Sequence, residues 1–183
     1  KITNMAFDGI IPAVLSGSVD VGASGFSVTE ERKKRVLFTE PFYKSGLTVL
    51  VAKGNEDKIQ GFKDLDGRKL AVQIGTTAAA KAKDIKDAKV QTFNNAGDAI
   101  LELANGGCEA VINDKPVTDY ILTQPRLAKK VVHLPDMLSA DDFAMVVAKD
   151  RPELAAELNA ALKALKENGE FDKLMMKWFG KAK

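Results

Sequence analysis

Short apolar runs of strand length alternate along the chain with segments of helical periodicity, and this alternation limits the possible folds most strongly. The run LTVLVA at 47–52 is apolar throughout, which is typical of a strand buried on both faces. Further strands are expected at 19–23, 69–74, 90–93, 110–112 and 143–148, and helices at 8–15, 78–83, 97–104 and 116–122. Such an order predicts an α/β fold with mostly parallel sheets.

The last part of the chain has the clearest helical pattern. Leucines at 154, 158, 162 and 165 recur at helical spacing, and Asn168-Gly169 provides a stop. A second, shorter helix is expected at 171–179, before Gly180. We expect its apolar residues, such as Leu174 and Trp178, to pack against other helices.

The charge and the rare residue types exclude several functions. The 27 basic and 25 acidic residues leave a net charge of +2, which gives no reason to expect nucleic acid or an anionic membrane as partner. The single cysteine, Cys108, excludes an intrachain disulfide and a cysteine-based zinc site. With one histidine, His133, triad-type hydrolysis is also disfavoured, and we expect no metal and no cofactor.

The segment 23–32 is the first candidate for a binding site. Ser24, Gly25 and Ser27 follow the expected strand at 19–23, and the carboxyl ends of strands are where open α/β sheets bind ligands. Arg32 follows a few residues later, and its planar guanidinium fits a carboxylate. The alternative is a turn with an exposed arginine.

Two further segments place polar groups after strands. Gln73-Ile74-Gly75-Thr76-Thr77 joins a strand to a helix, so backbone N–H groups there can point towards an anion; the alternative is an ordinary turn. Asn113-Asp114 ends another strand, and Asp114 can bind a cation or cap the helix that follows. A two-part anion site and an opposing carboxylate together complement a zwitterion.

Four motifs follow one another along nearly the whole chain: FDGIIPAVLSGSVDVGASGFSVTEERKK, KLAVQIGTTAAAK, GDAILELANGGCEAVINDKPV and GEFDKLMMKWFG. Together they resemble the polar amino acid group of solute-binding proteins that serve ABC importers, in particular the glutamine-binding branch. The resemblance implies an α/β fold of the periplasmic-binding-protein type II class, in which two α/β lobes joined by a two-strand hinge hold the ligand in the cleft between them. It places the first lobe at 1–46 plus 142–183 and the second at 47–141.

The resemblance also implies which residues hold the ligand's carboxylate. Arg32 would pair with the α-carboxylate through two parallel hydrogen bonds. Ser27 and the backbone N–H of Thr77 would assist it, and Phe7 would stack on the aliphatic part of the ligand.

For the ligand's ammonium group, the resemblance implies Asp114 as acceptor, together with the carbonyl of Gly25 and with Ser24. Gln73 and Asn113 occupy positions at which family members tune the preference for the ligand's side chain. Glutamine-specific relatives carry Lys and His at these two positions.

The function expected from this resemblance is the binding of a polar L-amino acid, glutamine or another polar or basic one, and its delivery to the permease subunits of an ABC importer. The location would be periplasmic or otherwise extracytoplasmic, with a lipid anchor on the full-length form as an option. Family members open with a strand, a helix and a strand that precede the Phe7 motif, so we expect this first lobe to be incomplete. Two alternatives remain: a dehydratase-like enzyme on the same scaffold, and the ligand-sensing domain of a receptor.

Overall fold

The chain divides into two compact units in the computed structural model, which describes residues 1–179. Unit 1 contains residues 1–8 and 45–140, and unit 2 contains residues 9–44 and the chain from Asp141 onward. The chain therefore crosses between the units after Asp8, Lys44 and Ala140. From the sequence we expected a first lobe at 1–46 plus 142–183 and a second at 47–141. Residues 1–8 were thus expected in the first lobe, whereas here they are grouped with residues 45–140.

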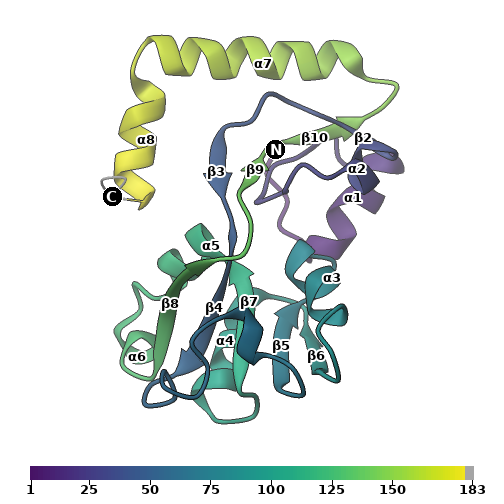
Figure 1. The fold of residues 1–183 in the computed structure, drawn as a ribbon. Coiled ribbons are helices and arrows are strands. Elements are labelled where there is room, and N and C mark those ends of the chain that lie inside the picture. The colour runs from purple at the N-terminus through teal and green to yellow at the C-terminus, as the bar shows by residue number, and fades with distance from the viewer. Residues whose placement is uncertain (180–183) are drawn as a thin grey trace. The chain divides into compact units, whose positions relative to one another are not determined.

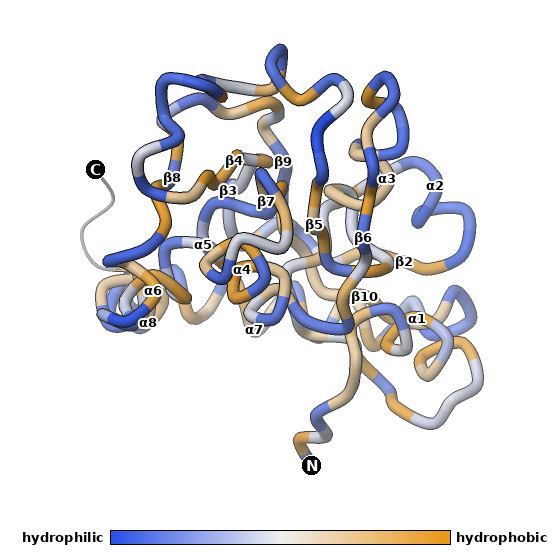
Figure 2. The backbone as a smooth tube through the Cα atoms, turned by 90° about the horizontal axis from the view of Figure 1, so that it is seen from below, coloured by the Kyte–Doolittle hydropathy of each residue, from blue (hydrophilic) through white to orange (hydrophobic). Residues whose placement is uncertain are grey.

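Unit 1 is built on a sheet of five strands in the order β6-β5-β7-β4-β8 (Figure 1). The strands are β4 (Leu47–Ala52), β5 (Lys69–Gln73), β6 (Lys89–Phe93), β7 (Ala110–Asp114) and β8 (Val131–Met137). All five residues of β7 are buried, as are the first five of β4, and Figure 2 shows the hydrophobic stretch along β4. The expected two-sided burial of 47–52 is thus confirmed.

Helices cover both faces of this sheet. On one face, α3 (Thr77–Lys83) and the short helix η1 (Phe62–Asp64) accompany a core that includes Val49, Leu70 and Ile112. On the other face, α4 (Ala96–Ala104), α5 (Lys115–Ile121) and α6 (Pro125–Ala128) accompany a core that includes Leu50, Ile100 and Val111. Successive residues of β4 and β7 alternate between the two cores, because side chains alternate across a strand.

The strand directions correct the prediction of mostly parallel sheets. Strand β5 pairs in parallel with β6 and β7, as strands joined by a crossover helix do. Strand β4, however, is antiparallel to both β7 and β8. The chain enters unit 1 just before β4, beside the end of β7, and so β4 must run the opposite way. Apolar periodicity indicates a strand but carries no information about its direction.

Unit 2 has a small antiparallel sheet in the order β1-β10-β2. Its strands are β1 (Val21–Gly22), β2 (Val36–Phe38) and β10 (Val146–Ala148). The helices are α1 (Phe7–Leu15), which begins in residues grouped with unit 1, α2 (Glu30–Lys33), α7 (Pro152–Glu167) and α8 (Glu170–Phe179). The long helix α7 packs against β10 and β2, and its buried Leu162 belongs to the predicted leucine pattern.

The expected strand at 143–148 is divided into two strands. Strand β9 (Asp141–Phe143) pairs with β3 (Tyr43–Ser45) in a sheet of its own, while β10 joins the unit 2 sheet. Both strands of the two-stranded sheet lie next to a crossing between the units in the sequence.

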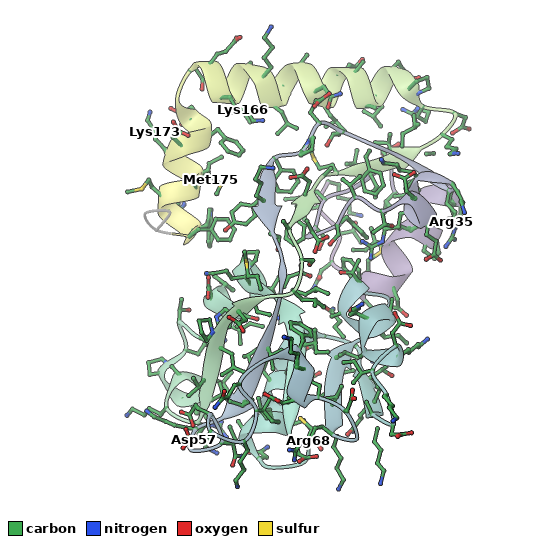
Figure 3. The ribbon with its side chains drawn as sticks, in the orientation of Figure 1. Arg35, Asp57, Arg68, Lys166, Lys173 and Met175 are labelled. Carbon is green, nitrogen blue, oxygen red and sulfur yellow. The ribbon has the colours of Figure 1, made fainter. Side chains whose placement is uncertain are left out.

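The final helix differs from its expected packing. None of the residues of α8 is buried, although Leu174 and Trp178 lie on it, and Phe179 stacks on Tyr43 with ring centroids 4.8 Å apart. Figure 3 labels Lys173 and Met175 on this helix. Gly180, which we expected after its end, lies outside the described residues. Within the part of the chain that the structure describes, no helix is long and apolar enough to cross a membrane.

Candidate functional site

Asp114 is a buried carboxylate at the carboxyl end of β7. It occupies the N-cap position of α5, but within the described structure its side chain makes no capping hydrogen bond to that helix. Instead, its Oδ1 accepts a hydrogen bond of 3.1 Å from the hydroxyl of Ser45. Both side chains belong to residues that are 6% exposed. The alternative of a simple helix cap is therefore not what the geometry shows.

The segment that carries Ser45 was not singled out in the sequence, yet it is fixed tightly around Asp114. The carbonyl of Gly46 accepts from the backbone N–H of Lys115 at 2.9 Å. The backbone N–H of Leu47 donates to the hydroxyl of Ser139 at 3.1 Å. The only signal in the sequence was Ser45-Gly46 directly before an apolar strand.

Gln73, Gly75 and Thr77 lie in the turn that joins β5 to α3. Gly75 has a φ of +76°, a left-handed conformation that favours glycine. Thr76 caps α3: its hydroxyl accepts from the backbone N–H of Ala79 at 3.1 Å and donates to the carbonyl of Gln73 at 2.7 Å. The side-chain amide of Gln73 donates to the carbonyl of Asn94 at 3.1 Å. Since β5 and β7 are parallel neighbours, this turn and Asp114 share one edge of the sheet.

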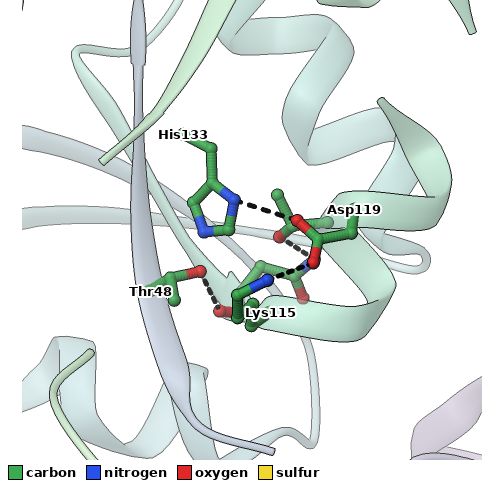
Figure 4. Close-up of polar contacts among 6 residues, drawn as sticks. Thr48, Lys115, Asp119 and His133 are labelled. Atoms are coloured by element: carbon green, nitrogen blue, oxygen red, sulfur yellow. Dashed lines mark hydrogen bonds and ion pairs between the residues drawn. The ribbon is translucent and has the colours of Figure 1, made fainter. Parts of the chain in front are cut away.

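Asn113 belongs to a polar cluster on the α5 side of the sheet, formed by Thr48, Asn113, Lys115, Thr118, Asp119 and His133 (Figure 4). Asn113 is 4% exposed, and its amide donates to the hydroxyl of Thr118 at 3.2 Å. The hydroxyl of Thr48 donates to the carbonyl of Asn113 at 3.1 Å. Asn113 and Asp114, as consecutive strand residues, point to opposite faces.

His133 is the ionisable centre of this polar cluster. Its Nδ1 lies 3.1 Å from Oδ1 of Asp119, whose other oxygen is paired with Lys115. Burial lowers the pKa of His133, the nearby Lys115 lowers it further, and Asp119 opposes both. Its Nε2 is buried and has no hydrogen-bond partner among the described residues. This arrangement supports the neutral imidazole.

In unit 2, Arg32 is held in place by its own neighbours. One guanidinium nitrogen donates to the carbonyl of Ser27 at 2.9 Å, and the guanidinium carbon lies 5.5 Å from the centroid of the Phe26 ring. The backbone N–H of Arg32 donates to the hydroxyl of Thr29, the N-cap residue of α2. A partly buried arginine fixed in this way needs little further ordering to accept a carboxylate.

The loop containing Ser24, Gly25 and Ser27 is attached to the segment that follows Asp141. The backbone N–H of Val28 donates to the carbonyl of Asp142 at 2.9 Å, and Ser27 forms an isolated β-bridge with Phe143. An added Cβ at Gly25 would lie 3.0 Å from the Phe143 ring. Ser27 is 1% exposed, whereas Ser24 and Gly25 are half-buried.

The predicted site residues are therefore distributed over both units. Gln73, Thr77, Asn113 and Asp114 belong to unit 1, and Ser24, Gly25, Ser27 and Arg32 belong to unit 2. Phe7, the first residue of α1, is grouped with unit 1. Among the described residues, no three His, Cys, Asp or Glu side chains come together in a way that could hold a metal ion.

The fold defines the class of the protein, a solute-binding protein of the type II periplasmic-binding fold. The chain belongs to the family of bacterial extracellular solute-binding proteins, family 3, which matches residues 1–181. The family description names an extracellular protein, which confirms the location predicted from the sequence.

Two curated relatives illustrate the match. The chain is 34% identical over 174 residues to a probable histidine-binding protein of Campylobacter jejuni, covering 94% of this chain and 66% of the relative. It is 31% identical over 180 residues to the ABC transporter arginine-binding protein 1 of Escherichia coli, covering 97% of this chain and 73% of the relative. The chain thus spans about two thirds to three quarters of the length of these relatives.

Solved structures agree with this assignment. An ancestral arginine-binding protein bound to arginine is 38% identical, has a TM-score of 0.90, and is matched over 98% of this chain and 80% of its own. An ancestral amino acid-binding protein described as a precursor of cyclohexadienyl dehydratase is also 38% identical, with a TM-score of 0.89 and coverage of 98% and 77%. Both descriptions are of binding proteins, which supports the prediction that the chain binds a solute and is not an enzyme.

Proposed function

We propose that the chain binds a polar or basic L-amino acid through the ligand's α-ammonium and α-carboxylate groups. The observation that carries the proposal is the Asp114 carboxylate, which is buried, lies at the end of a central strand, and is held by Ser45 without capping α5. A buried carboxylate is costly unless a positive group or hydrogen bonds compensate it. A ligand's ammonium group would add a positive charge and hydrogen-bond donors to the partners that Asp114 already has.

The second half of the proposal concerns the carboxylate of the ligand. Arg32 supplies a charge-assisted pair, and its fixed position over Phe26 lowers the entropy lost on binding. Ser27 and the backbone N–H of Thr77, in the first turn of α3, assist as hydrogen-bond donors. Phe7, Ser24 and the carbonyl of Gly25 complete the proposed contacts.

The preference for one side chain over another is assigned to Gln73 and Asn113. Gln73 lies at the strand end next to the α3 turn, and we propose that its uncharged amide, which also donates to the carbonyl of Asn94, contacts the ligand side chain. Asn113 is buried and bonded to Thr118, and we propose that it acts indirectly, by fixing the start of α5. Because neither amide carries a charge, both polar and basic ligand side chains are compatible with these two residues. This agrees with the relatives named for arginine and histidine.

The proposed partners of the loaded chain are the permease subunits of an ABC importer. Support comes from the name of the Escherichia coli relative, which assigns that protein to an ABC transporter.

The test is a titration of the purified chain, by calorimetry and thermal melting, with L-arginine, L-histidine, L-glutamine and L-lysine. We expect at least one of them to bind and to raise the melting temperature as its concentration increases. Arg32→Ala and Asp114→Ala should each weaken binding at least tenfold, because each removes one partner of a charge-assisted pair.

Matched controls are available on the same units. Arg35→Ala removes an exposed arginine three residues after Arg32, and Asp57→Asn removes an exposed acid of unit 1; both positions are labelled in Figure 3. We expect both controls to bind like the parent chain. Equal affinity of the parent and of either Arg32→Ala or Asp114→Ala would contradict the proposed site.

A further inference from the structure

The hydroxyl that holds Asp114 comes from the point at which the chain enters unit 1. Ser45 is the last residue of β3 and the first residue of that unit after the crossing. Its hydroxyl and Oδ1 of Asp114 are 3.1 Å apart, although the two residues are 69 positions apart in the sequence. A hydroxyl that donates to one carboxylate oxygen fixes the rotation of the whole carboxylate plane.

Ser45 cannot easily move away from Asp114, because the residues after it are fixed on two sides. On one side, the carbonyl of Gly46 accepts from the backbone N–H of Lys115. On the other, the backbone N–H of Leu47 donates to the hydroxyl of Ser139, and the backbone N–H of Leu138 donates to the carbonyl of Leu47 at 2.9 Å. The entry segment 45–47 therefore links Asp114 to the exit segment 138–139.

We infer that Ser45 is a positioning residue for ligand binding: its hydroxyl orients the Asp114 carboxylate towards the ligand's α-ammonium group. This inference rests on the proposed function and adds to it a residue that none of the motifs contains. Because Ser45 lies on the entry segment, the orientation of Asp114 depends on the entry and exit segments, and the strength of ammonium recognition depends on them too.

Thr48 provides an internal contrast. Its hydroxyl is as deeply buried as that of Ser45, in a residue that is 1% exposed and only three positions further along. It donates to the backbone carbonyl of Asn113, so its loss weakens the packing of β4 on β7 without touching a charged group. A variant at Thr48 therefore reports the structural cost of removing a buried hydroxyl from this region.

The experiment compares binding of an amino acid with binding of its des-amino analogue, in which hydrogen replaces the α-amino group. The probe is whichever of L-arginine, L-histidine, L-glutamine and L-lysine the parent binds most tightly. The ratio of the two affinities measures ammonium recognition alone. We expect Ser45→Ala to weaken binding of the amino acid about tenfold and to leave binding of the analogue nearly unchanged, so that the ratio falls.

Two further variants separate positioning from general damage. Ser45→Thr keeps the hydroxyl and should restore the ratio of the parent, whereas Thr48→Val should lower the melting temperature and leave the ratio unchanged. If Ser45→Ala does not fold, Ser45→Cys replaces it in the experiment. Cysteine is similar in size to serine but is a weak hydrogen-bond donor, so this variant should also lower the ratio.

The outcomes are distinct. If the parent binds and Ser45→Ala keeps the parent's ratio, or weakens both ligands equally, the role of Ser45 is overturned while the proposed function stands. If the parent binds none of the four amino acids, the proposed function fails and the inference fails with it.

Discussion

His133 is the only histidine of the chain, and its half-buried imidazole lies against an aspartate that is also paired with a lysine. Burial is the largest influence on its pKa and lowers it from the usual value of 6.5. The group therefore favours folding when it is neutral and opposes folding when it is protonated. The stability of the folded chain should therefore depend on the pH through this one side chain.

We predict that the free energy of unfolding falls as the pH is lowered from 7.5 to 5.5. The unfolded chain takes up a proton on His133 near pH 6.5, while the folded chain resists protonation until its lower pKa is reached. Urea unfolding at several pH values measures the effect. His133→Gln should flatten the profile in this window, in which ordinary carboxylates do not titrate; an unchanged slope in this variant would assign the pH dependence to other groups.

Burial makes the thiol of Cys108 unreactive. Burial, together with Glu102 and Glu109, raises the pKa of its thiol to about 12. At pH 8 only about one thiol in ten thousand is then the reactive thiolate. We predict that a disulfide reagent labels the folded chain at least a hundredfold more slowly than the chain in urea. Comparable rates in the two states would contradict this burial.

The entry segment passes close to the backbone of the exit segment at Gly46. An added Cβ at Gly46 would lie 2.1 Å from the carbonyl oxygen of Ser139, which is backbone and cannot rotate away. The identity of this residue therefore decides how closely the two segments can approach. Elsewhere, as at Gly9 in α1, an added Cβ would meet nothing within 4 Å.

We predict that Gly46→Ala lowers the free energy of unfolding by about 1–3 kcal/mol, because the two segments must separate to admit the methyl group. Gly9→Ala is the matched control and should be neutral or stabilising by up to about 1 kcal/mol, since alanine favours a helix. Urea unfolding of both variants checks the prediction. A Gly46→Ala variant as stable as the parent would mean that the contact is loose.

The sequence predicted the strands that are apolar on both faces, such as β4 and β5, and the long helix α7, since their periodicity is strong. It missed β8, because Pro135 and Asp136 interrupt the apolar pattern of this strand. The strand lies at the edge of the sheet, a position that tolerates proline. Asp114 was recognisable because it ends a strand. Ser45 was not, because a contact between residues so far apart follows from strand order and direction, which local patterns do not contain.

At the scale of the whole molecule, each unit has a sheet and buried residues of its own. Unit 1 contains the complete five-stranded sheet, with a hydrophobic core on each face. Its residues 45–140 are continuous in the sequence, and only residues 1–8 join them from elsewhere.

We predict that a fragment of residues 45–140 folds cooperatively, because all five strands and both cores of unit 1 lie within it. Circular dichroism should show a single thermal transition, and its amide NMR spectrum should be dispersed. A fragment that melts without cooperativity would show that the remainder of the chain is needed for the fold of this unit.

The contact between Gly46 and Ser139 brings the two ends of unit 1 together at one point. Because the ends of the segment 46–139 meet, recombination between related genes at the codons for this pair would replace the proposed binding residues within that segment and keep those outside it. Chimaeras joined at these positions should therefore combine the specificities of two parents, and new preferences could arise in evolution by one such exchange.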